Sequence, residues 1–287
     1  MIQYIPFAKM SGAGNDFVVI DNRQQLILHP DAAARTLCDR RLGIGADGLL
    51  LVEKSTLADF TMKYYNADGS SGGMCGNGGR CIAMFAFREH IADHRLMRFD
   101  ALEYVYQAEV TDGMVILSMK NPVDLRLNKR LKVNGLDVCY HFINTGTAHC
   151  VVLMDENPGL FAADFESASI NELGRAIRQH ADFAPFGTNV NFIDVRDSAI
   201  VQRTYERGVE DETLACGTGS VASSIIVHLL RGVAMPVTVR VRSGELLRID
   251  FTEDGATKGI TNVTLEGSAR IVYEGTVVYD TERDTVC

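Results

Sequence analysis

Residues 74–81 read MCGNGGRC and residues 215–220 read ACGTGS, so the motif Cys-Gly-x-Gly occurs twice, at Cys75 and at Cys216. An apolar, helix-like run follows each motif directly. We expect each run to be a helix whose first backbone N–H groups point out of a glycine-rich turn, at the positive end of the helix dipole. Such an end binds anions and favours ionisation of a neighbouring thiol. The two motifs therefore predict two thiols that meet at one small anion.

Composition and charge are those of an ordinary globular chain. The 287 residues are 46% hydrophobic and 23% charged, enough for one large or two ordinary domains. The net charge of −9 argues against a nucleic-acid partner, because phosphate binding needs a basic surface. Residues 1–6 lack the layout of a signal peptide, and no run approaches the roughly 20 apolar residues of a membrane span. Seven cysteines without disulfide or C-x-x-C spacing indicate a reducing, cytoplasmic setting.

The first half of the chain reads as strands around the first Cys-Gly turn. Asp31 is the predicted N-cap of a helix over residues 32–39. Residues 43–48 spell GIGADG, but a dinucleotide-binding GxGxxG follows a strand and begins a helix. This one follows the predicted helix and leads into a strand, so we interpret it as a tight turn. Strands are expected over residues 2–9, 17–21, 49–52, 60–65, 104–110, 115–119 and 131–133.

The second half repeats this order. Ser169 and Glu172 have the spacing of a capping box and predict a helix that reaches about His180. Each Cys-Gly turn follows a polar turn and a strand that ends in tyrosine, and the two cysteines lie about half the chain apart. This cryptic repeat predicts two similar α/β halves whose helix N-termini face each other. Strands are expected over residues 138–143, 150–154, 190–194, 200–205, 237–242, 246–251, 262–266 and 269–273.

Two opposed thiols suit one kind of reaction. If a carboxylate binds between the two turns, its α-carbon lies between the sulfurs. One thiolate then removes the α-proton, and the other thiol supplies a proton to the opposite face. Fixed donors around the carboxylate stabilise the carbanion, each worth about 3 kcal/mol. The pair therefore predicts a racemase or epimerase that needs no cofactor, with two sulfurs that titrate together.

The remaining cysteines have simpler interpretations. Cys38, Cys139 and Cys150 are expected to be inert buried residues, and Cys81 is expected to face inward from the first helix. A thiol oxidoreductase would carry C-x-x-C, which is absent from the sequence. A cysteine hydrolase would need one nucleophile with a histidine partner. The duplicated context thus separates Cys75 and Cys216 from the others.

Seven segments of the chain, in the same order, resemble the diaminopimelate epimerase family along nearly the whole length. They are residues 9–17, 43–47, 66–70, 75–80, 189–190, 206–208 and 215–219. The Cys-Gly-Asn-Gly form also distinguishes the chain from the related proline racemases, which usually carry Cys-Gly-His.

The resemblance implies an α/β (α+β) fold of two pseudo-symmetric domains, each a barrel-like mixed β-sheet around a central helix. Residues 1–121 with 272–287 would form the half that carries Cys75, and residues 122–271 the half that carries Cys216. The implied reaction interconverts LL- and meso-diaminopimelate, in lysine and peptidoglycan precursor biosynthesis, with no cofactor and no metal. The implied partner is this small molecule, with no nucleic acid and no membrane; a homodimer is left open.

The resemblance also assigns roles to residues. Cys75 and Cys216 match the acid/base pair, and His149 with Glu206 matches groups that tune it. Arg207 offers a two-pronged contact to the distal carboxylate, at the end of the substrate that is held but not inverted. The substrate-binding positions are Asn15, Asn66, Gly76, Asn77, Asn189, Glu206, Arg207, Gly217 and Thr218.

Three departures from the family pattern keep other functions open. The family loop often reads Asn-Pro-His where this chain has Thr147-Ala148-His149, Gly48 replaces a glutamine of some members, and the segment before Cys216 is about one residue longer. One alternative is a racemase of another amino acid on the same two-thiol scaffold. Another is a phosphate- or dinucleotide-binding module, which would tolerate loss of both cysteines.

Overall fold

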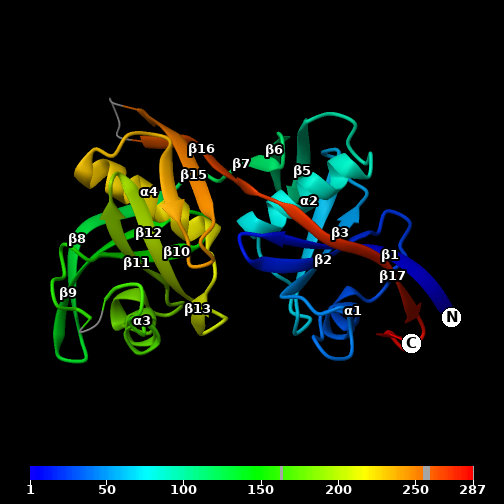
Figure 1. The fold of residues 1–287 in the computed structure, drawn as a ribbon, viewed down its shortest axis with the longest axis horizontal. Coiled ribbons are helices and arrows are strands. Elements are labelled where there is room, and N and C mark those ends of the chain that lie inside the picture. The colour runs from blue at the N-terminus through cyan, green and yellow to red at the C-terminus, as the bar shows by residue number, and fades with distance from the viewer. Residues whose placement is uncertain (162–163, 255–258, 287) are drawn as a thin grey trace. The chain divides into compact units, whose positions relative to one another are not determined.

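The computed structural model describes residues 1–161, 164–254 and 259–286 (Figure 1). The chain divides into two compact units, Met1–Ser118 with Glu266–Cys287, and Met119–Leu265. It leaves the first unit after β7 (Met114–Ser118) and returns to it within β16 (Gly259–Ser268). The first unit therefore consists of the two ends of the chain, and the second unit of its middle.

The first unit is a mixed sheet whose strands pair in the order β18, β17, β1, β2, β3, β4, β5, β6, β7. The pairs β2–β3 and β4–β5 are parallel, and the other pairs are antiparallel. Figure 1 shows β17 running beside β1, the two ends of the chain thus sharing one ladder. The bounds are β1 (Ile2–Gly12), β2 (Asn15–Asp21), β3 (Gly48–Glu53), β4 (Phe60–Asn66), β5 (Leu96–Ala101), β6 (Tyr104–Val110), β17 (Arg270–Asp280) and β18 (Thr285–Val286).

Helix α2 (Gly76–Arg88) lies at the centre of this unit. Every residue from Gly76 to Ala86 is buried, and the helix packs against β1, β2, β3, β4, β6 and β7. Alternate side chains of β2 and β3 divide between the two faces of the sheet. Val18, Ile20 and Leu49 pack in one cluster with α1 (Pro30–Leu37), whereas Phe17 and Leu50 face Gly78 of α2. One sheet thus holds a helix on each face.

The second unit has the same kind of sheet, with β8, β9, β10, β11, β12, β14 and β15 paired in that order. Helix α4 (Gly217–Arg231) packs against β9, β10, β11, β12, β14 and β15, and α3 (Asn171–Arg178) contacts β11 and β12. A short strand β13 (Asp211–Thr213) pairs with β12 just before Cys216. The bounds are β8 (Val123–Val133), β9 (Leu136–Asn144), β10 (Ala148–Leu153), β11 (Asn189–Arg196), β12 (Ala199–Glu206), β14 (Val237–Arg240) and β15 (Leu246–Asp254).

The pairing pattern confirms the internal repeat. Neighbouring strands from β1 to β6 pair antiparallel, parallel, antiparallel, parallel and antiparallel. Antiparallel and parallel pairs alternate in the same order along β9, β10, β11, β12, β14 and β15. Helix α2 follows β4, and α4 follows β12 after the short strand β13. Each Cys-Gly turn therefore joins the equivalent strand to the equivalent central helix.

Two predicted helix caps are wrong. The first helix begins at Pro30 with His29 as N-cap, so Asp31 lies in the first turn and pairs with Arg35 at 2.8 Å. Helix α3 begins at Asn171 after Ile170, with no side-chain cap. Proline at the first helical position fixes the start of α1 two residues earlier than expected. No helix among the described residues is both long enough and apolar enough to cross a membrane.

Candidate active site

Cys75 is the N-cap of α2. Its backbone is extended (φ −103°, ψ 121°), and its Sγ accepts a hydrogen bond from the Gly78 N–H at 3.5 Å. Sγ also donates to Oδ1 of Asn15 at 3.6 Å. The first unit thus joins two of the predicted site residues at the N-terminus of a buried helix.

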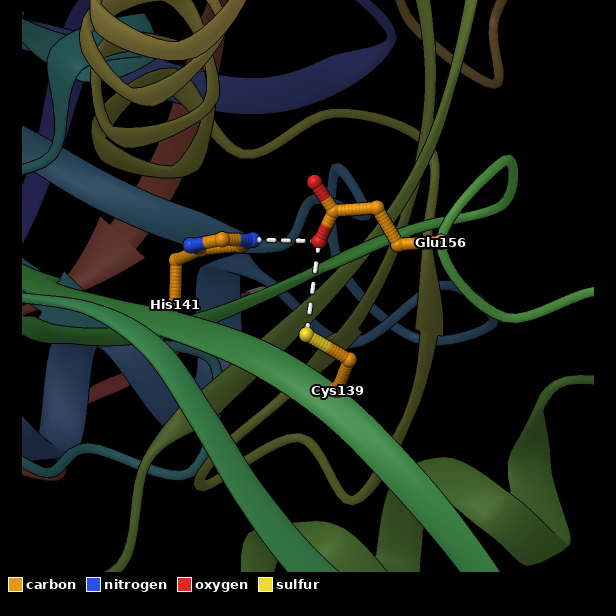
Figure 2. A group of neighbouring side chains, drawn as sticks. All are labelled: Cys139, His141 and Glu156. Carbon is orange, nitrogen blue, oxygen red and sulfur yellow. Dashed lines mark hydrogen bonds and ion pairs between the residues drawn. The ribbon is translucent and has the colours of Figure 1, made fainter.

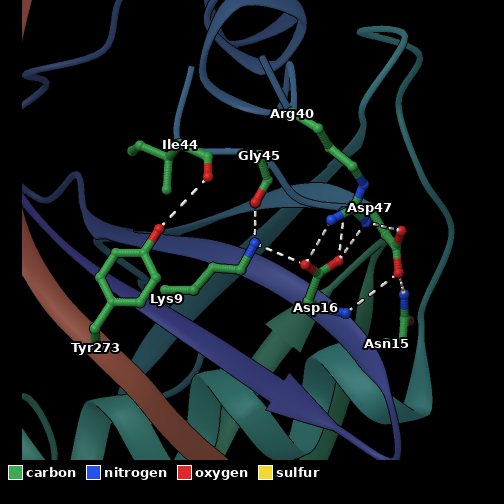
Figure 3. Close-up of polar contacts among 8 residues, drawn as sticks. All are labelled: Lys9, Asn15, Asp16, Arg40, Ile44, Gly45, Asp47 and Tyr273. Atoms are coloured by element: carbon green, nitrogen blue, oxygen red, sulfur yellow. Dashed lines mark hydrogen bonds and ion pairs between the residues drawn. The ribbon is translucent and has the colours of Figure 1, made fainter. Parts of the chain in front are cut away.

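Asn15 is held by a cluster of charges at the start of β2 (Figure 3). Its Nδ2 donates to Oδ2 of Asp47 at 2.6 Å. Arg40 bridges Asp47 at 2.7 Å and Asp16 at 2.9 Å, and Lys9 pairs with Asp16 at 2.7 Å. Lys9 also donates to the Gly45 carbonyl. The cluster fixes which end of the Asn15 carboxamide faces Cys75.

The charge of Asp16 is stabilised by its neighbours. Burial raises the pKa of this carboxyl, but hydrogen bonds from Arg40 and Lys9 outweigh burial and hold it at about 2. Asp16 is therefore ionised at neutral pH, as the two cations around it require.

Asn66 lies at the end of β4, where Tyr64 fixes its orientation. The Tyr64 hydroxyl donates to Asn66 Oδ1 at 2.7 Å, and Asn66 Nδ2 donates to Ser70 Oγ at 2.9 Å. A Cβ on Gly48 would come within 2.5 Å of Tyr64 Cε2. The ring of Tyr64 thus explains why glycine stands at position 48 in this chain.

Hydrogen bonds from a buried arginine hold the first turn of α2. Asn77 is buried, and Arg80 donates to its Oδ1 at 3.0 Å and to the Gly76 carbonyl at 3.2 Å. Arg80 is itself fully buried and also donates to the Ser268 carbonyl at 3.4 Å. The guanidinium therefore ties the first turn of the helix to the return of the chain into this unit.

Cys216 is the N-cap of α4, again with an extended backbone (φ −125°, ψ 106°). Its Sγ lies 3.5 Å from Oγ1 of Thr218. That hydroxyl lies 2.9 Å from Nε2 of His149 and 3.2 Å from Oγ1 of Thr147. Gly217, Thr218, His149 and Cys216 are thus brought together at the N-terminus of α4.

His149 is neutral at physiological pH. Its side chain is fully buried at the start of β10. Burial, and secondarily the charge of Arg207, lowers its pKa to about 3. Asn191 contacts its Nδ1 at 3.0 Å. The imidazole therefore takes part in hydrogen bonding without bringing a positive charge.

Arg207 and Asn189 are joined through the backbone. The Arg207 N–H donates to Asn189 Oδ1 at 2.8 Å, and the Arg207 guanidinium donates to the Phe186 carbonyl at 3.2 Å. Glu206, at the end of β12, accepts from Thr213 Oγ1 at 2.9 Å. These residues lie at the end of the strand that leads to the second Cys-Gly turn.

Several residues of these networks were not singled out from the sequence. They are Asp47, Tyr64, Arg80 and Asn191, together with Gln202 and Thr204. Gln202 donates to Thr204 at 3.2 Å, and Thr204 donates to Asn191 at 2.9 Å. Asp47 lies in the GIGADG turn, and Asn191 follows Asn189 by two residues in β11. Their role depends on contacts between distant parts of the chain, which periodicity does not reveal.

A second cluster of titratable groups lies elsewhere in the second unit (Figure 2). Glu156 Oε2 lies 2.8 Å from His141 Nε2 and 3.4 Å from Cys139 Sγ. The Asn128 N–H donates to His141 Nδ1 at 3.1 Å, so Nδ1 accepts and Nε2 is the nitrogen that donates to Glu156. Arg231 also donates to Glu156 at 2.7 Å. A protonated Nε2 and a neighbouring guanidinium disfavour a metal ion, and the cluster is a hydrogen-bonded network.

Solved structures identify the class of fold. A Bacillus anthracis phenazine biosynthesis protein of the PhzF family superposes with a TM-score of 0.75 at 14% identity, covering 96% of this chain and 99% of that chain. A probable proline racemase from Agrobacterium radiobacter K84 superposes with a TM-score of 0.72 at 17% identity, covering 98% and 96%. The chain therefore has the two-part α/β fold of these proteins.

Sequence comparison identifies the family. The diaminopimelate epimerase family pattern matches residues 7–123 and 141–272. The Chlorobaculum tepidum diaminopimelate epimerase is 44% identical over 276 residues, covering 93% of this chain and 99% of the relative. The Aquifex aeolicus diaminopimelate epimerase is 42% identical over 283 residues, covering 94% and 96%. The chain belongs to the diaminopimelate epimerase family, which confirms the resemblance read from the seven segments.

Proposed function

We propose that the protein interconverts LL- and meso-diaminopimelate, with Cys75 and Cys216 as the acid/base pair and without a cofactor. One observation carries the proposal. In both repeats, the turn between the equivalent strand and the central helix places a cysteine at the helix N-cap. Family membership supplies the class of reaction, and the repeat supplies two thiols of equivalent position.

The proposed step moves one proton off the α-carbon and another onto it. A thiolate takes the α-hydrogen as a proton, and the electron pair of the C–H bond is delocalised into the carboxylate. The thiol on the opposite face then gives its proton to the α-carbon. Backbone N–H groups of Gly76, Asn77, Gly217 and Thr218 hold the carboxylate where charge develops, each such donor being worth about 3 kcal/mol. The configuration inverts, and the charge has passed from one sulfur to the other.

The distal end of the substrate needs separate groups, because it is bound but not inverted. We assign its carboxylate to Arg207, and its ammonium group to Glu206 and to the carboxamides of Asn15, Asn66 and Asn189. A guanidinium presents two parallel N–H donors to a carboxylate.

The proposed partner is a small molecule, with neither a nucleic acid nor a membrane, in a cytoplasmic setting. We also propose a homodimer, for which light scattering would give twice 31.5 kDa.

The cysteine pair is tested by single substitutions. Cys75→Ala and Cys216→Ala should each lower epimerisation of LL-diaminopimelate at least ~100-fold, since positioned proton transfer contributes about 10²–10⁴. The assay follows deuterium incorporation from deuterated water under reductant, with circular dichroism to confirm folding. Cys81→Ala, at a buried position on the same helix, is the control and should retain most activity. Robust turnover by either of the first two variants would contradict the two-thiol mechanism.

The substrate is tested at Arg207. Arg207→Ala should lower kcat/KM for diaminopimelate by ~100-fold or more, because a charged hydrogen-bonded pair contributes about 1.5–3 kcal/mol or more when bidentate. Arg207→Lys should recover only part of it, since an ammonium group lacks the planar fork. Thr147 in place of the family asparagine favours one competing function, a racemase of a simpler amino acid. Normal kinetics in Arg207→Ala, with racemisation of such a substrate, would support that competitor.

A further inference from the structure

The two cysteine sulfurs have different neighbours. Cys75 Sγ lies 3.6 Å from the amide oxygen of Asn15, and Cys216 Sγ lies 3.5 Å from the hydroxyl of Thr218. An amide oxygen only accepts a hydrogen bond, whereas a hydroxyl donates one and accepts others. The protonation state that each site favours therefore depends on what fixes Asn15 and Thr218.

Asn15 is fixed by Asp47. Its Nδ2 lies 2.6 Å from Asp47 Oδ2, and a carboxylate has no proton to give. The carboxamide therefore keeps its nitrogen toward Asp47 (Figure 3). Its oxygen then faces Cys75. A thiol at Cys75 donates to this oxygen and accepts from the Gly78 N–H. A thiolate would face the lone pairs of Asn15 instead, so the first unit favours the protonated form.

Thr218 is reached by a directed chain of buried hydrogen bonds that starts at Gln202. Nε2 of Gln202 lies 3.4 Å from the Cys216 carbonyl, which only accepts, so the amide nitrogen faces this way. The same Nε2 donates to Thr204 Oγ1 at 3.2 Å. Thr204 in turn donates to Asn191 Oδ1 at 2.9 Å. The Asn191 nitrogen is thereby left to donate to Nδ1 of His149 at 3.0 Å.

This series of hydrogen bonds determines the tautomer of His149. Nδ1 accepts from Asn191, and the ring is neutral, so the proton is on Nε2. Nε2 lies 2.9 Å from the Oγ1 atoms of both Thr147 and Thr218. His149 therefore donates toward this pair of hydroxyls.

A second chain reaches the same point through Thr147. The Arg207 N–H donates to Asn189 Oδ1 at 2.8 Å, so the nitrogen of Asn189 faces Thr147 Oγ1 at 3.4 Å. Thr147 accepts there and donates to Thr218 Oγ1 at 3.2 Å. Thr218 thus accepts from Thr147 and from His149. Its own proton is directed to the Cys216 sulfur at 3.5 Å.

We propose that the resting enzyme carries its proton on Cys75 and its negative charge on Cys216, with Asp47 and Thr147 as positioning residues for this asymmetry. The inference rests on the proposed function, because the asymmetry matters for catalysis only if the two thiols act as an acid/base pair. The contacts that support it lie within each unit. A hydrogen bond donated to a charged group stabilises the charge. Cys216 is then the base that is ready when substrate arrives, and Cys75 is the acid.

The asymmetry gives the two directions of reaction different starting points. Substrate whose α-hydrogen faces Cys216 reacts at once: the hydrogen leaves as a proton to Cys216, and Cys75 donates its proton to the other face. The product enzyme has its charge on Cys75, beside the Asn15 oxygen. The opposite enantiomer reacts only with this less favoured form of the enzyme, in which Cys75 carries the charge. Charged groups near Cys75 include Asp47, Asp16, Arg40, Lys9 and the buried Arg80. Charged groups near the second Cys-Gly turn include Arg207 and Glu206.

The rate of alkylation distinguishes the charge of each cysteine from its solvent exposure. Only a thiolate attacks iodoacetamide, forming a C–S bond as iodide leaves. Cys75 is partly exposed, whereas Cys216 is 6% exposed. Access alone would therefore favour Cys75. We expect Cys216 to be carbamidomethylated first at pH 7, by peptide mapping of the substrate-free full chain, with Cys75 following at higher pH. Faster labelling of Cys75, or equal rates, would overturn the proposal.

Variants test the two fixing contacts. Thr218→Val removes the donated proton while keeping the side-chain shape, and should slow Cys216 labelling about tenfold at pH 7, because a hydrogen bond to a charged group is worth about 1.5–3 kcal/mol. Thr218→Ser should restore the wild-type rate. Thr238→Val, on β14, is the matched control and should change neither cysteine. Unchanged Cys216 labelling in folded Thr218→Val would contradict the directed chain.

The positioning residues are tested in the same way. Asp47→Asn lets the Asn15 carboxamide turn its nitrogen to Cys75, so Cys75 labelling should accelerate at pH 7. Asp137→Asn, at an exposed position, is the control. Thr147→Val should slow Cys216 labelling, and Thr147→Ser should restore it. Failure to turn over diaminopimelate would count against the proposed function alone, because labelling needs no substrate. Normal turnover with Cys75 labelled before Cys216 would count against this inference alone.

Discussion

Tyr64 shows how one side chain restricts the choice of residue at several others. Its ring lies over two glycines: a Cβ on Gly72 would come within 2.1 Å of Tyr64 Cδ1, and one on Gly48 within 2.6 Å of the Tyr65 carbonyl oxygen as well as 2.5 Å of the ring. Its hydroxyl orients Asn66. The glutamine that some family members carry at position 48 therefore does not fit beside this tyrosine.

Gly48→Ala should destabilise the protein by about 1–3 kcal/mol, the usual cost of overpacking a well-packed site. The tyrosine ring could move, but the Tyr65 carbonyl belongs to the paired strand β4. Urea unfolding measures the loss. Gly73→Ala is the matched control, because a Cβ there meets nothing within 4 Å, and should be neutral. Equal stability of the two variants would show that the packing around position 48 is loose.

At the scale of single residues, the sequence was sufficient to predict that Cys75 and Cys216 stand directly before buried helices. It was insufficient to predict which residues orient their neighbours Asn15 and Thr218. Cys75 and Cys216 stand out because a rare motif is repeated. Asp47 could not be recognised, because its contact with Asn15 joins positions 32 residues apart and depends on the parallel pairing of β2 with β3. The orientation of an amide is a tertiary property, so no local pattern contains it.

At the scale of elements, the charge cluster fastens the turn at residues 43–48 to the first two strands. Lys9 lies on β1 and Asp16 on β2, and Arg40 follows α1. The low pKa of Asp16 means that its ionised form is stabilised in the folded protein relative to the unfolded chain. Its contribution is present above the unfolded pKa of 3.8 and is lost as pH falls through about 2.

Asp16→Asn should remove this contribution, up to about 2 kcal/mol before solvent screening reduces it. The unfolding free energy of the wild type minus that of the variant should be positive at pH 6 and should shrink between pH 4 and pH 2. Urea titrations across this range measure the difference. Asp137→Asn should show no such trend. A difference that stays constant down to pH 2 would mean that the Asp16 charge does not stabilise the fold.

The sequence predicted the interiors of elements better than their ends. Periodicity and the repeat located both central helices, whereas the caps at Asp31 and Ser169 were wrong. Strand β5 (Leu96–Ala101) was missed, and only the last part of β8 was expected. Strand β5 is six residues long and alternates buried with more exposed side chains, but its length gives only a short signal. Most of β8 is exposed on both faces, so no buried face marks it in the sequence.

At the scale of the whole molecule, the proposed mechanism brings one thiol from each unit to the same carbon atom. A disulfide between them would require their Cα atoms to come to about 4.4–6.8 Å. A thiolate at a helix N-terminus is readily oxidised. The active pair is therefore expected to be sensitive to oxidants.

Mild oxidant should inactivate the protein by joining Cys75 to Cys216, and reductant should restore activity. Bound substrate should protect, because it would lie between the sulfurs. Non-reducing peptide mapping identifies the cross-link. Cys38 and Cys150 are internal controls, since burial raises the pKa of the Cys38 thiol to about 12 and that of the Cys150 thiol well above its usual range. An inactive form that keeps Cys75 and Cys216 reduced, or that links a control cysteine, would contradict the proposed mechanism.

The pairing of β1 with β17 has a consequence for synthesis of the chain. Ile2 lies opposite Asp280, and the N-terminal amino group pairs with the Asp280 carboxylate at 3.0 Å. A ribosome makes the chain from the N-terminus at about 5–20 residues per second, and domains fold as their residues emerge. The unit that contains Cys216 is complete once Leu265 has emerged, whereas β1 waits for a neighbour translated near the end. The half of the enzyme that begins first is thus finished last, and a nascent chain stalled before Arg270 would display β1 without its outer partner.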